Sequence, residues 1–422
     1  MNISNNRFES QLKNGIRVVL YYRLNTPITT DAVIHSGSKF DPEETPGFSH
    51  FLEHLIVSGS KKFPTKDLLA EHIESVGGFF GATTNQDFIT IRTEIPYKND
   101  YNRAVDIFEA TLCKPLLDEK SFNNEKKVVI KEIKISQSNP NRVLVKVCRE
   151  LFFKGNQFEH DVLGDSDSIL NINYKETVSN HKKWFNKDRI NFVVSGDILI
   201  EDLVKNLNKL DFIKNEEKLP NFKIINKDNN EKILNSFLDI PQTHLCFGFL
   251  APLSYSKEML HINILGDILA NGRSSRLTKI LRYKKGLIYS IHSNRLGGLE
   301  KGLFGFFTST ENEKVQEVVN EIIFEIKNIK ENGILDSELE FIKNKKIKSL
   351  KRSMQTSNSW VDFHKDYEIF IKGLYTIENY IKDIEATTTK DIKKVIDDYF
   401  KEENWKLAMC GKTKKEDVKI LF

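Results

Sequence analysis

The chain has 422 residues, of which 39% are hydrophobic and 29% charged, and it contains only 10 Pro and 21 Gly. This composition excludes collagen-like, low-complexity and wholly disordered proteins, and the length predicts about two to four domains, with two large ones as the simplest case. The 63 basic and 59 acidic residues give a net charge of +4, which is too balanced to indicate nucleic acid as the main ligand.

The sequence lacks signals for a membrane or an oxidising compartment. It has no apolar run of about 18 residues, so we expect no transmembrane helix. The stretch from Met1 to Arg17 lacks the apolar core of a signal peptide. Four cysteines lie far apart without a C-x-x-C pair, which favours neither a disulfide framework nor a thiolate zinc site: Cys113, Cys148, Cys246 and Cys410. We therefore expect a soluble, cytoplasmic protein that binds no membrane.

The first half of the chain alternates between predicted strands and helices. Apolar residues recur at helical spacing over residues 48–56, Pro46 fits the first turn of the predicted helix, and Gly59 is placed to end it. The other elements follow from β-forming runs, from alternation of apolar and polar residues, and from turn signals. They are strands at 16–22, 30–34 and 88–95, and helices near 65–76, 101–111 and 119–137.

A change of character at residues 214–232 predicts the boundary between two domains. This segment is polar and charged and contains one proline, as is typical of a linker. The predicted domains are then residues 1–213 and 233–422. The alternative for the same segment is an ordinary long surface loop.

The second half of the chain resembles the first. A strand at 245–250 and a helix that ends near Gly272 correspond to the strand at 32–34 and the helix that ends near Gly59. When Gly272 is aligned with Gly59, the positions of His50, Glu53 and His54 are taken by other residue types, namely Asn263, Gly266 and Asp267. Either the chain arose by internal duplication and kept a functional site only in the first copy, or two α+β units are alike by chance.

Two histidines four residues apart lie in the helix at 48–56. His50 and His54 therefore share one helix face, which is the geometry that two nitrogen ligands of a tetrahedral zinc ion require. Glu53 lies beside them, too close in sequence to be a third ligand, but able to take a proton from a metal-bound water. The alternative is a helix that carries two histidines near a glutamate by chance, although its apolar neighbours indicate an enclosed polar face.

Two further carboxylates lie in the helix predicted at 119–137. Glu125 and Glu132 are seven residues apart, so they share a helix face with Val128 and Val129. Carboxylates on an apolar face are costly unless a cation pairs with them. A metal ion is one such cation. A surface network of ion pairs with neighbouring lysines is the alternative, and this segment alone favours it.

The run His50-x-x-Glu53-His54 resembles the inverted zinc signature of the pitrilysin/insulinase peptidases. In that family the third ligand is a glutamate roughly 80 residues after the second histidine, with another glutamate seven residues before it. Glu132 lies at that separation from His54, and Glu125 precedes Glu132 by seven positions. The resemblance therefore implies one zinc ion per chain held by His50, His54 and Glu132. It also implies that Glu53 is the general base and Glu125 an assisting catalytic carboxylate outside the ligand set.

Residues 77–84 extend the resemblance. They are similar to the family's Gly-Gly-x-x-Asn-Ala-x-Thr stretch, an edge strand to which substrate adds as a further β-strand. The resemblance implies that Gly81, Ala82 and Thr83 contact substrate. Gly81 departs from the family's asparagine, which puts one hydrogen bond to the substrate in doubt. Without the family, this segment is a glycine-rich turn before a strand.

Two residues in the second half complete the resemblance, which spans about residues 8–405. Arg282 and Tyr289 are seven residues apart, like a family pair that holds the substrate backbone and the tetrahedral intermediate. A guanidinium and a phenol hydroxyl can both donate to an oxyanion. Taken without the family, Arg282 lies in a basic segment and would be a solvated side chain.

The resemblance implies the fold and the function together. The expected fold is α+β, with two tandem similar domains that each have a mixed, mostly antiparallel sheet covered by helices on one side, as half of a clamshell. The short two-domain branch of the family resembles mitochondrial processing peptidase and its bacterial relatives. It implies a zinc endopeptidase that cuts extended peptides or leader segments inside a chamber formed by a homodimer or by a heterodimer with a related subunit. The alternatives are a partner-dependent subunit of a processing peptidase and a non-catalytic zinc-binding scaffold.

Overall fold

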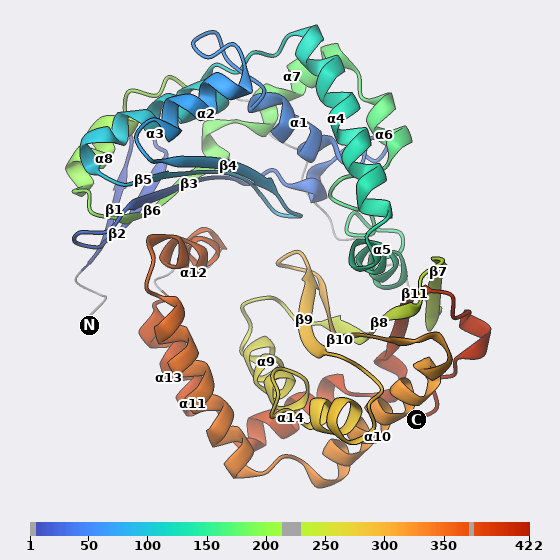
Figure 1. Cartoon of the computed structure of the whole chain (residues 1–422). Coiled ribbons are helices and arrows are strands. Elements are labelled where there is room, and N and C mark those ends of the chain that lie inside the picture. The colour runs from blue at the N-terminus through green and yellow to red at the C-terminus, as the bar shows by residue number, and fades with distance from the viewer. Residues whose placement is uncertain (1–5, 213–228, 371–374) are drawn as a thin grey trace. The chain divides into compact units, whose positions relative to one another are not determined.

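Two β-sheets organise the chain, one in each of two units (Figure 1). The computed structural model describes residues 6–212, 229–370 and 375–422. Within these residues, the first unit is built from 6–133, 162–212, 350–370 and 375–380, and the second from 134–161, 229–349 and 381–422. The predicted linker at 214–232 lies outside the described residues as far as residue 228.

The first unit is built on a six-stranded sheet in the order β1-β2-β6-β3-β5-β4. Only β2 and β6 pair in parallel, and the other neighbours are antiparallel. The strands are β1 (Arg7–Gln11), β2 (Arg17–Tyr22), β3 (Ile28–Ile34), β4 (Phe79–Thr84), β5 (Ile89–Ile95) and β6 (Ile190–Gly196). The helices, with α4 running one turn into the second unit, are α1 (Phe48–Ile56), α2 (Lys66–Glu74), α3 (Tyr101–Phe108), α4 (Glu119–Gln137), α6 (Ser166–Asn171), α7 (Tyr174–Trp184), α8 (Ile200–Leu207) and α12 (Ser357–Phe370).

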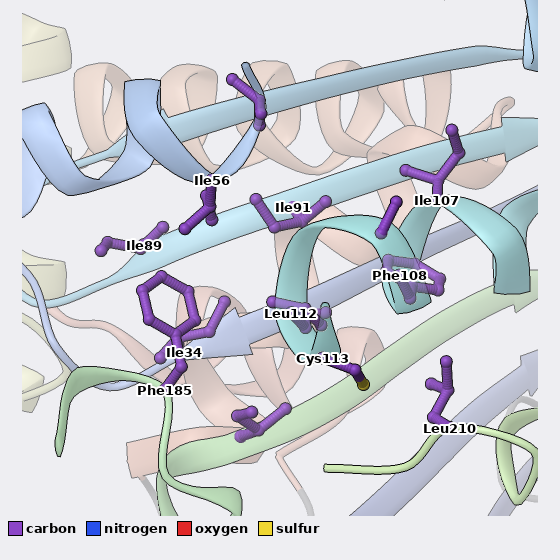
Figure 2. Packing of buried hydrophobic residues seen from close by; sticks show 14 of the residues in the cluster. Ile34, Ile56, Ile89, Ile91, Ile107, Phe108, Leu112, Cys113, Phe185 and Leu210 are labelled. Atoms are coloured by element: carbon purple, nitrogen blue, oxygen red, sulfur yellow. The ribbon is translucent and has the colours of Figure 1, made fainter. Parts of the chain in front are cut away.

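The core of the first unit lies between this sheet and the helices that cover one of its faces. Figure 2 shows a part of it, where Ile89 and Ile91 of β5 meet Ile56 of α1 and Phe108 of α3. Each of these four side chains is fully buried, and burial of one such side chain contributes about 1.5–3 kcal/mol. The elements that carry the candidate site therefore belong to one continuous core.

The other face of this sheet is covered by α12, from far along the chain (Figure 1). Polar contacts fix the helix there. Glu368 of α12 accepts hydrogen bonds from Arg7 at 2.6 Å, Arg17 at 2.6 Å and the Tyr21 hydroxyl at 2.5 Å. Burial alone would raise the pKa of the Glu368 carboxyl, but these donors outweigh it, so the pKa lies below its usual range. Asn358, near the start of α12, donates to Glu94 of β5 at 2.6 Å.

The second unit repeats the first in its topology. Its five-stranded sheet has the order β7-β11-β8-β10-β9, and only β7 and β11 pair in parallel. The strands β7, β11, β8, β10 and β9 correspond in order to β2, β6, β3, β5 and β4 of the first sheet, and only β1 has no counterpart. This correspondence supports the internal repeat expected from the sequence. The strands are β7 (Ile233–Phe237), β8 (Gln242–Ala251), β9 (Ile291–Gly297), β10 (Gly302–Glu311) and β11 (Lys406–Gly411). The helices, of which α11 and α13 are shared with the first unit, are α5 (Pro140–Phe152), α9 (Lys257–Leu269), α10 (Val315–Asn332), α11 (Asp336–Ser353), α13 (Ile377–Ala386) and α14 (Thr389–Tyr399).

The fold class expected from the sequence is confirmed, since each unit has a mixed sheet with helices. The division of the chain differs from two contiguous domains. In the first half, α5 follows the long helix α4, yet it packs on the sheet of the second unit. In the second half, α12 follows the long helix α11 and packs on the sheet of the first unit. Each half of the chain thus contributes the equivalent helix, α5 or α12, to the sheet of the other half. Composition does not change at these crossings, so no sequence signal marks them.

No helix among the described residues is long and apolar enough to cross a membrane.

Replacing Glu368 by Gln tests how α12 is held. Because the pKa of Glu368 is lowered in the folded protein, its carboxylate stabilises the fold above its usual pKa, and this contribution is lost as the pH falls through the lowered value. We expect Glu368→Gln to lower the thermal unfolding midpoint at pH 6, and the difference from wild type to shrink toward pH 3. Glu201→Gln, at an exposed position of α8, is the control. A difference that stays constant from pH 6 to pH 3 would contradict this account.

Candidate metal centre

Helix α1 is anchored by the burial of one of its faces. Phe51, Leu52, Leu55 and Ile56 are fully buried in the core of the first unit, as their helical spacing predicts. This fixes which side chains point away from the core. His50 and Glu53 are nevertheless largely buried and His54 is half-buried, so the polar face is enclosed rather than solvated.

The N-terminus of α1 is capped by a carboxylate from outside the helix. Asp41 accepts hydrogen bonds from the backbone N–H of Gly47 and of Ser49, both at 2.8 Å, and from the Ser49 hydroxyl. The same hydroxyl accepts a bond of 3.1 Å from the indole N–H of Trp184. A carboxylate at this end of a helix satisfies free N–H groups and complements the helix dipole. The residue before His50 is therefore held from two sides.

Helix α4 brings the distant carboxylates to α1. Phe122 of α4 packs edge-to-face on Phe51 of α1, with ring centroids 5.2 Å apart. One helical turn further along α4, Glu125 reaches His54, and two turns beyond that Glu132 reaches both histidines. The aromatic contact thus determines how far α4 is shifted along α1, and with it which residues of α4 face the histidines.

Three groups converge on one point that can hold a metal. One nitrogen each of His50 and His54 and one oxygen of Glu132 all lie within 4.8 Å of one another. The His54 Nε2 and Glu132 Oε2 atoms are 3.4 Å apart, and the His50 Nε2 and Glu132 Oε2 atoms are 3.8 Å apart. Two imidazoles and a carboxylate around an open position are the donor set of a catalytic zinc ion. The residues present therefore fit zinc.

Glu125 lies behind one of these groups. Its Oε2 is 3.2 Å from Nδ1 of His54, the ring nitrogen on the far side from Glu132. A carboxylate in this position fixes the tautomer and the orientation of a histidine ligand and makes the ring a better donor. Burial alone would lower the pKa of His54, but the bond to Glu125 and the charges of Glu53 and Glu132 raise it overall.

Glu53 is buried beside the three donors. Burial raises the pKa of its carboxyl, while a hydrogen bond from Thr84 and the nearby His54 act in the opposite direction. The Thr84 hydroxyl donates to Glu53 Oε2 at 2.7 Å. A carboxylate with a raised pKa close to a metal position is suited to accept and release a proton.

The segment expected to contact substrate is the edge strand of the first sheet. Gly81, Ala82 and Thr83 lie in β4, which pairs with β5 on one side and with no described strand on the other. The ring of Phe79 lies over Gly81, because a Cβ atom built on Gly81 would be 3.0 Å from its Cζ atom. The space of the family's asparagine is thus taken in part by Phe79, which is 52% exposed.

Arg282 and Tyr289 belong to the second unit and lie close together there. The Arg282 guanidinium is 4.7 Å from the centroid of the Tyr289 ring, a cation–π contact. Arg282 lies in a π-helical turn, Thr278–Lys284, and Tyr289 is 76% exposed. The two groups are thus adjacent, and the tyrosine is accessible.

At the equivalent place in the second unit, an ion pair replaces the metal ligands. Asp267 of α9, at the position of His54, accepts from the Lys346 ammonium and from the Asn271 amide, each at 2.8 Å. Lys346 lies in α11, the helix that follows the second sheet's strands as α4 follows those of the first. An ammonium group therefore supplies the positive charge that a metal ion would bring, and no second metal centre is found among the described residues.

Two residues of the site were missed in the sequence, Asp41 and Thr84. Asp41 is eight residues before Ser49 and outside any helix, so no helical spacing connects it with α1. For Thr84 the sequence indicates only a place in the strand motif at residues 77–84. Strand alternation places the Thr84 side chain on the face of β4 opposite to Gly81 and Thr83. Alternation alone does not indicate which helix packs on that face.

The chain matches two domain models of one peptidase family. Residues 17–166 match the model described as Insulinase (Peptidase family M16), and residues 171–346 match the model described as Peptidase M16 inactive domain. The first match contains His50, Glu53, His54 and Glu132, and the second contains Arg282 and Tyr289.

Individual relatives agree with these matches. The chain is 24% identical over 394 residues to the uncharacterized zinc protease YmxG of Bacillus subtilis, which covers 93% of this chain and 95% of the relative. It is 27% identical over 200 residues to the probable mitochondrial-processing peptidase subunit beta of Arabidopsis thaliana, which covers 47% of this chain and 37% of the relative. The crystal structure of a protease from Helicobacter pylori has a TM-score of 0.89 at 20% identity and covers 96% of this chain and 99% of that chain. At this identity the structural likeness shows the same two-domain fold.

The role of Glu125 can be separated from that of a ligand. We expect Glu125→Gln to weaken zinc binding by about 10- to 100-fold, because His54 loses an ionised partner, and Glu132→Gln to weaken it further, because a donor is removed. The measurement is competition with a chromogenic chelator. Glu119→Gln, an exposed residue of the same helix, is the control. Equal affinities of the Glu125→Gln and Glu119→Gln variants would refute the role of Glu125.

Proposed function

Because the chain belongs to the M16 insulinase/pitrilysin family of peptidases, in a branch similar to mitochondrial processing peptidase, we propose that it is a zinc-dependent endopeptidase that hydrolyses extended peptides. One observation carries the proposal. His50, His54 and Glu132 converge on one position, and the buried carboxylate of Glu53 lies beside them. A non-catalytic zinc scaffold would need no such carboxylate.

Each residue of the first unit has a role in this proposal. His50, His54 and Glu132 hold one zinc ion, and Glu125 orients His54. A zinc ion there supplies Lewis-acid activation of water and of the scissile carbonyl. Glu53 takes a proton from the attacking water and returns it to the leaving amine.

Substrate binding is assigned to the edge strand β4. The backbone of residues 81–83 would hydrogen-bond an extended peptide as an added strand, so that a folded protein is a poor substrate. Backbone pairing does not need the side chain of the family's asparagine, so Gly81 leaves it intact. The exposed Phe79 ring offers apolar contact beside it.

The catalytic set is completed, in our proposal, by a second chain. Arg282 and Tyr289 of one protomer would donate to the developing oxyanion at the zinc site of its partner. This chain carries both the metal ligands and this pair, so a homodimer is sufficient. The similarity to a subunit of mitochondrial processing peptidase supports the second candidate, a chain that is active only with a related partner subunit.

The proposed chemistry is tested with quenched peptides of about 10–30 residues. We expect the zinc-loaded protein to cut them, chelator to abolish the cutting, and Glu53→Gln to lower kcat by about 100-fold or more while zinc binding persists. Glu71→Gln, an exposed residue of α2, is the matched control.

Absence of cutting by folded, zinc-loaded wild type would rule out the self-sufficient enzyme. It would leave the partner-dependent subunit and the scaffold. Cutting restored by a co-purified related chain would then select the partner-dependent subunit.

The proposed dimer predicts complementation between two inactive variants. Chains with Glu53→Gln retain Tyr289, and chains with Tyr289→Phe retain Glu53. If the tyrosine acts in the partner's site, each mixed dimer has one complete site, and random mixing restores about a quarter of the wild-type activity. Activity is measured before and after the two proteins are unfolded together and refolded. A mixture no more active than the two variants separately would exclude this arrangement.

A further inference from the structure

The hydroxyl of Thr84 is the only hydrogen-bond donor to the Glu53 side chain among the described residues. Its Oγ1 donates to Glu53 Oε2 at 2.7 Å, which is the length of a strong bond to a carboxylate. Glu53 lies on α1 and Thr84 is the last residue of β4. The bond therefore joins the metal-binding helix to the edge strand.

The alternation of β4 explains why Thr84 reaches Glu53. Phe80 and Ala82 pack against the core beneath the helices, and Thr84 continues this row. Phe79, Gly81 and Thr83 form the row on the opposite face. On β5, Phe79 pairs with Glu94 and Gly81 pairs with Arg92, and both of these β5 residues form hydrogen bonds with α12. A peptide paired with the edge of β4 would leave Thr84 free to hold Glu53.

The end of β4 is held rigidly by a neighbouring segment. The backbone N–H groups of residues 37, 38 and 39 donate to the carbonyls of residues 87, 85 and 86 at 3.0–3.1 Å. The approach is so close at Gly37 that a Cβ atom there would be 2.4 Å from the backbone of Asn85. Only glycine permits this contact. The turn that follows Thr84 is thus fixed in place.

A buried ion pair strengthens the same turn. The Lys39 ammonium donates to Asp87 at 2.8 Å, and both residues are almost fully buried. Buried pairs of this kind add little net stability, but they enforce one arrangement, because a displaced charge would be left unpaired. Thr84 therefore presents its hydroxyl from a preorganised position.

We infer that Thr84 is the positioning residue of the general base: its hydroxyl fixes one oxygen of Glu53, so that the other oxygen is presented to the water. This inference rests on the function proposed above for the role of Glu53. A carboxylate on three rotatable bonds would otherwise sample several rotamers. A fixed donor removes that freedom before substrate binds.

The test compares Thr84→Val, which keeps the shape and loses the hydroxyl, with Thr84→Ser, which keeps the hydroxyl. We expect Thr84→Val to lower kcat by about tenfold with KM and zinc affinity unchanged, and Thr84→Ser to remain within about threefold of wild type. Thr93→Val is the matched control. Thr93 is a buried threonine of the neighbouring strand β5 whose hydroxyl has no partner among the described residues.

A second readout does not depend on peptide cleavage. In the cobalt-loaded protein, the visible absorption bands report the surroundings of the metal. We expect Thr84→Val to shift them in the same direction as Glu53→Gln, and Thr84→Ser and Thr93→Val to leave them unchanged. If wild type cuts no peptide but this pattern holds, the self-sufficient enzyme is ruled out, while the positioning of the Glu53 carboxylate by Thr84 stands.

Three results would overturn the positioning role. The first is a Thr84→Val variant with the kcat and the cobalt spectrum of wild type. The second is an equal loss of kcat in Thr84→Ser, since the hydroxyl would then not be what matters. The third is a weakened zinc affinity in Thr84→Val, which would indicate a general disturbance of α1.

Discussion

The packing of α1 against α4 is the contact on which the candidate site depends. The edge-to-face contact of Phe51 with Phe122 sets how far α4 is shifted along α1, and Glu132 lies almost three helical turns beyond Phe122 on α4. A shift by one residue would rotate Glu132 by about 100° and move it by about 1.5 Å, and it would no longer face His54. Replacing a buried phenylalanine by alanine costs about 3–5 kcal/mol, and here it would also release this register. The packing of the apolar core thus determines the geometry of the candidate metal site.

The exchange of α5 and α12 between the two halves of the chain explains why neither half is a complete domain. Each sheet has one face covered by helices of its own half and the other by the equivalent helix of the other half. Without α12, the first sheet would expose a face bearing the buried carboxylate of Asp31 and its partner Arg92. Burying such groups requires that they be paired, and α12 adds Asp362 to the pair at 2.6 Å. The two halves of the chain therefore depend on each other for stability, not only for connection.

Between residues 16 and 137 the sequence predicted most of the helices and strands, and it also predicted the metal donors, because both leave local or fixed-distance patterns. The helix at 119–137 has the predicted bounds, whereas the helix expected from Pro46 to about Ser58 is shorter and spans Phe48–Ile56. His50, His54 and Glu132 lie together as the resemblance implies. What could not be predicted is nonlocal. Asp41 and Thr84 reach α1 from a loop and from a strand end, and no spacing encodes such contacts. The packing of α5 and α12 on the sheet of the other half could not be predicted for the same reason, since an amphipathic helix does not specify which of two similar sheets it covers.

The second unit shows how the same position of the fold is neutralised without metal ligands. Asp267, at the position of His54, is only 19% exposed, and its charge would be costly there without a counter-charge. Lys346 supplies that charge from α11, the helix that corresponds to α4. A covalently attached ammonium needs no ligand geometry, so this pair does not require the precise register that the metal donors require of α1 and α4. The same unit carries Arg282 and Tyr289, whose use in our proposal requires accessibility rather than a metal.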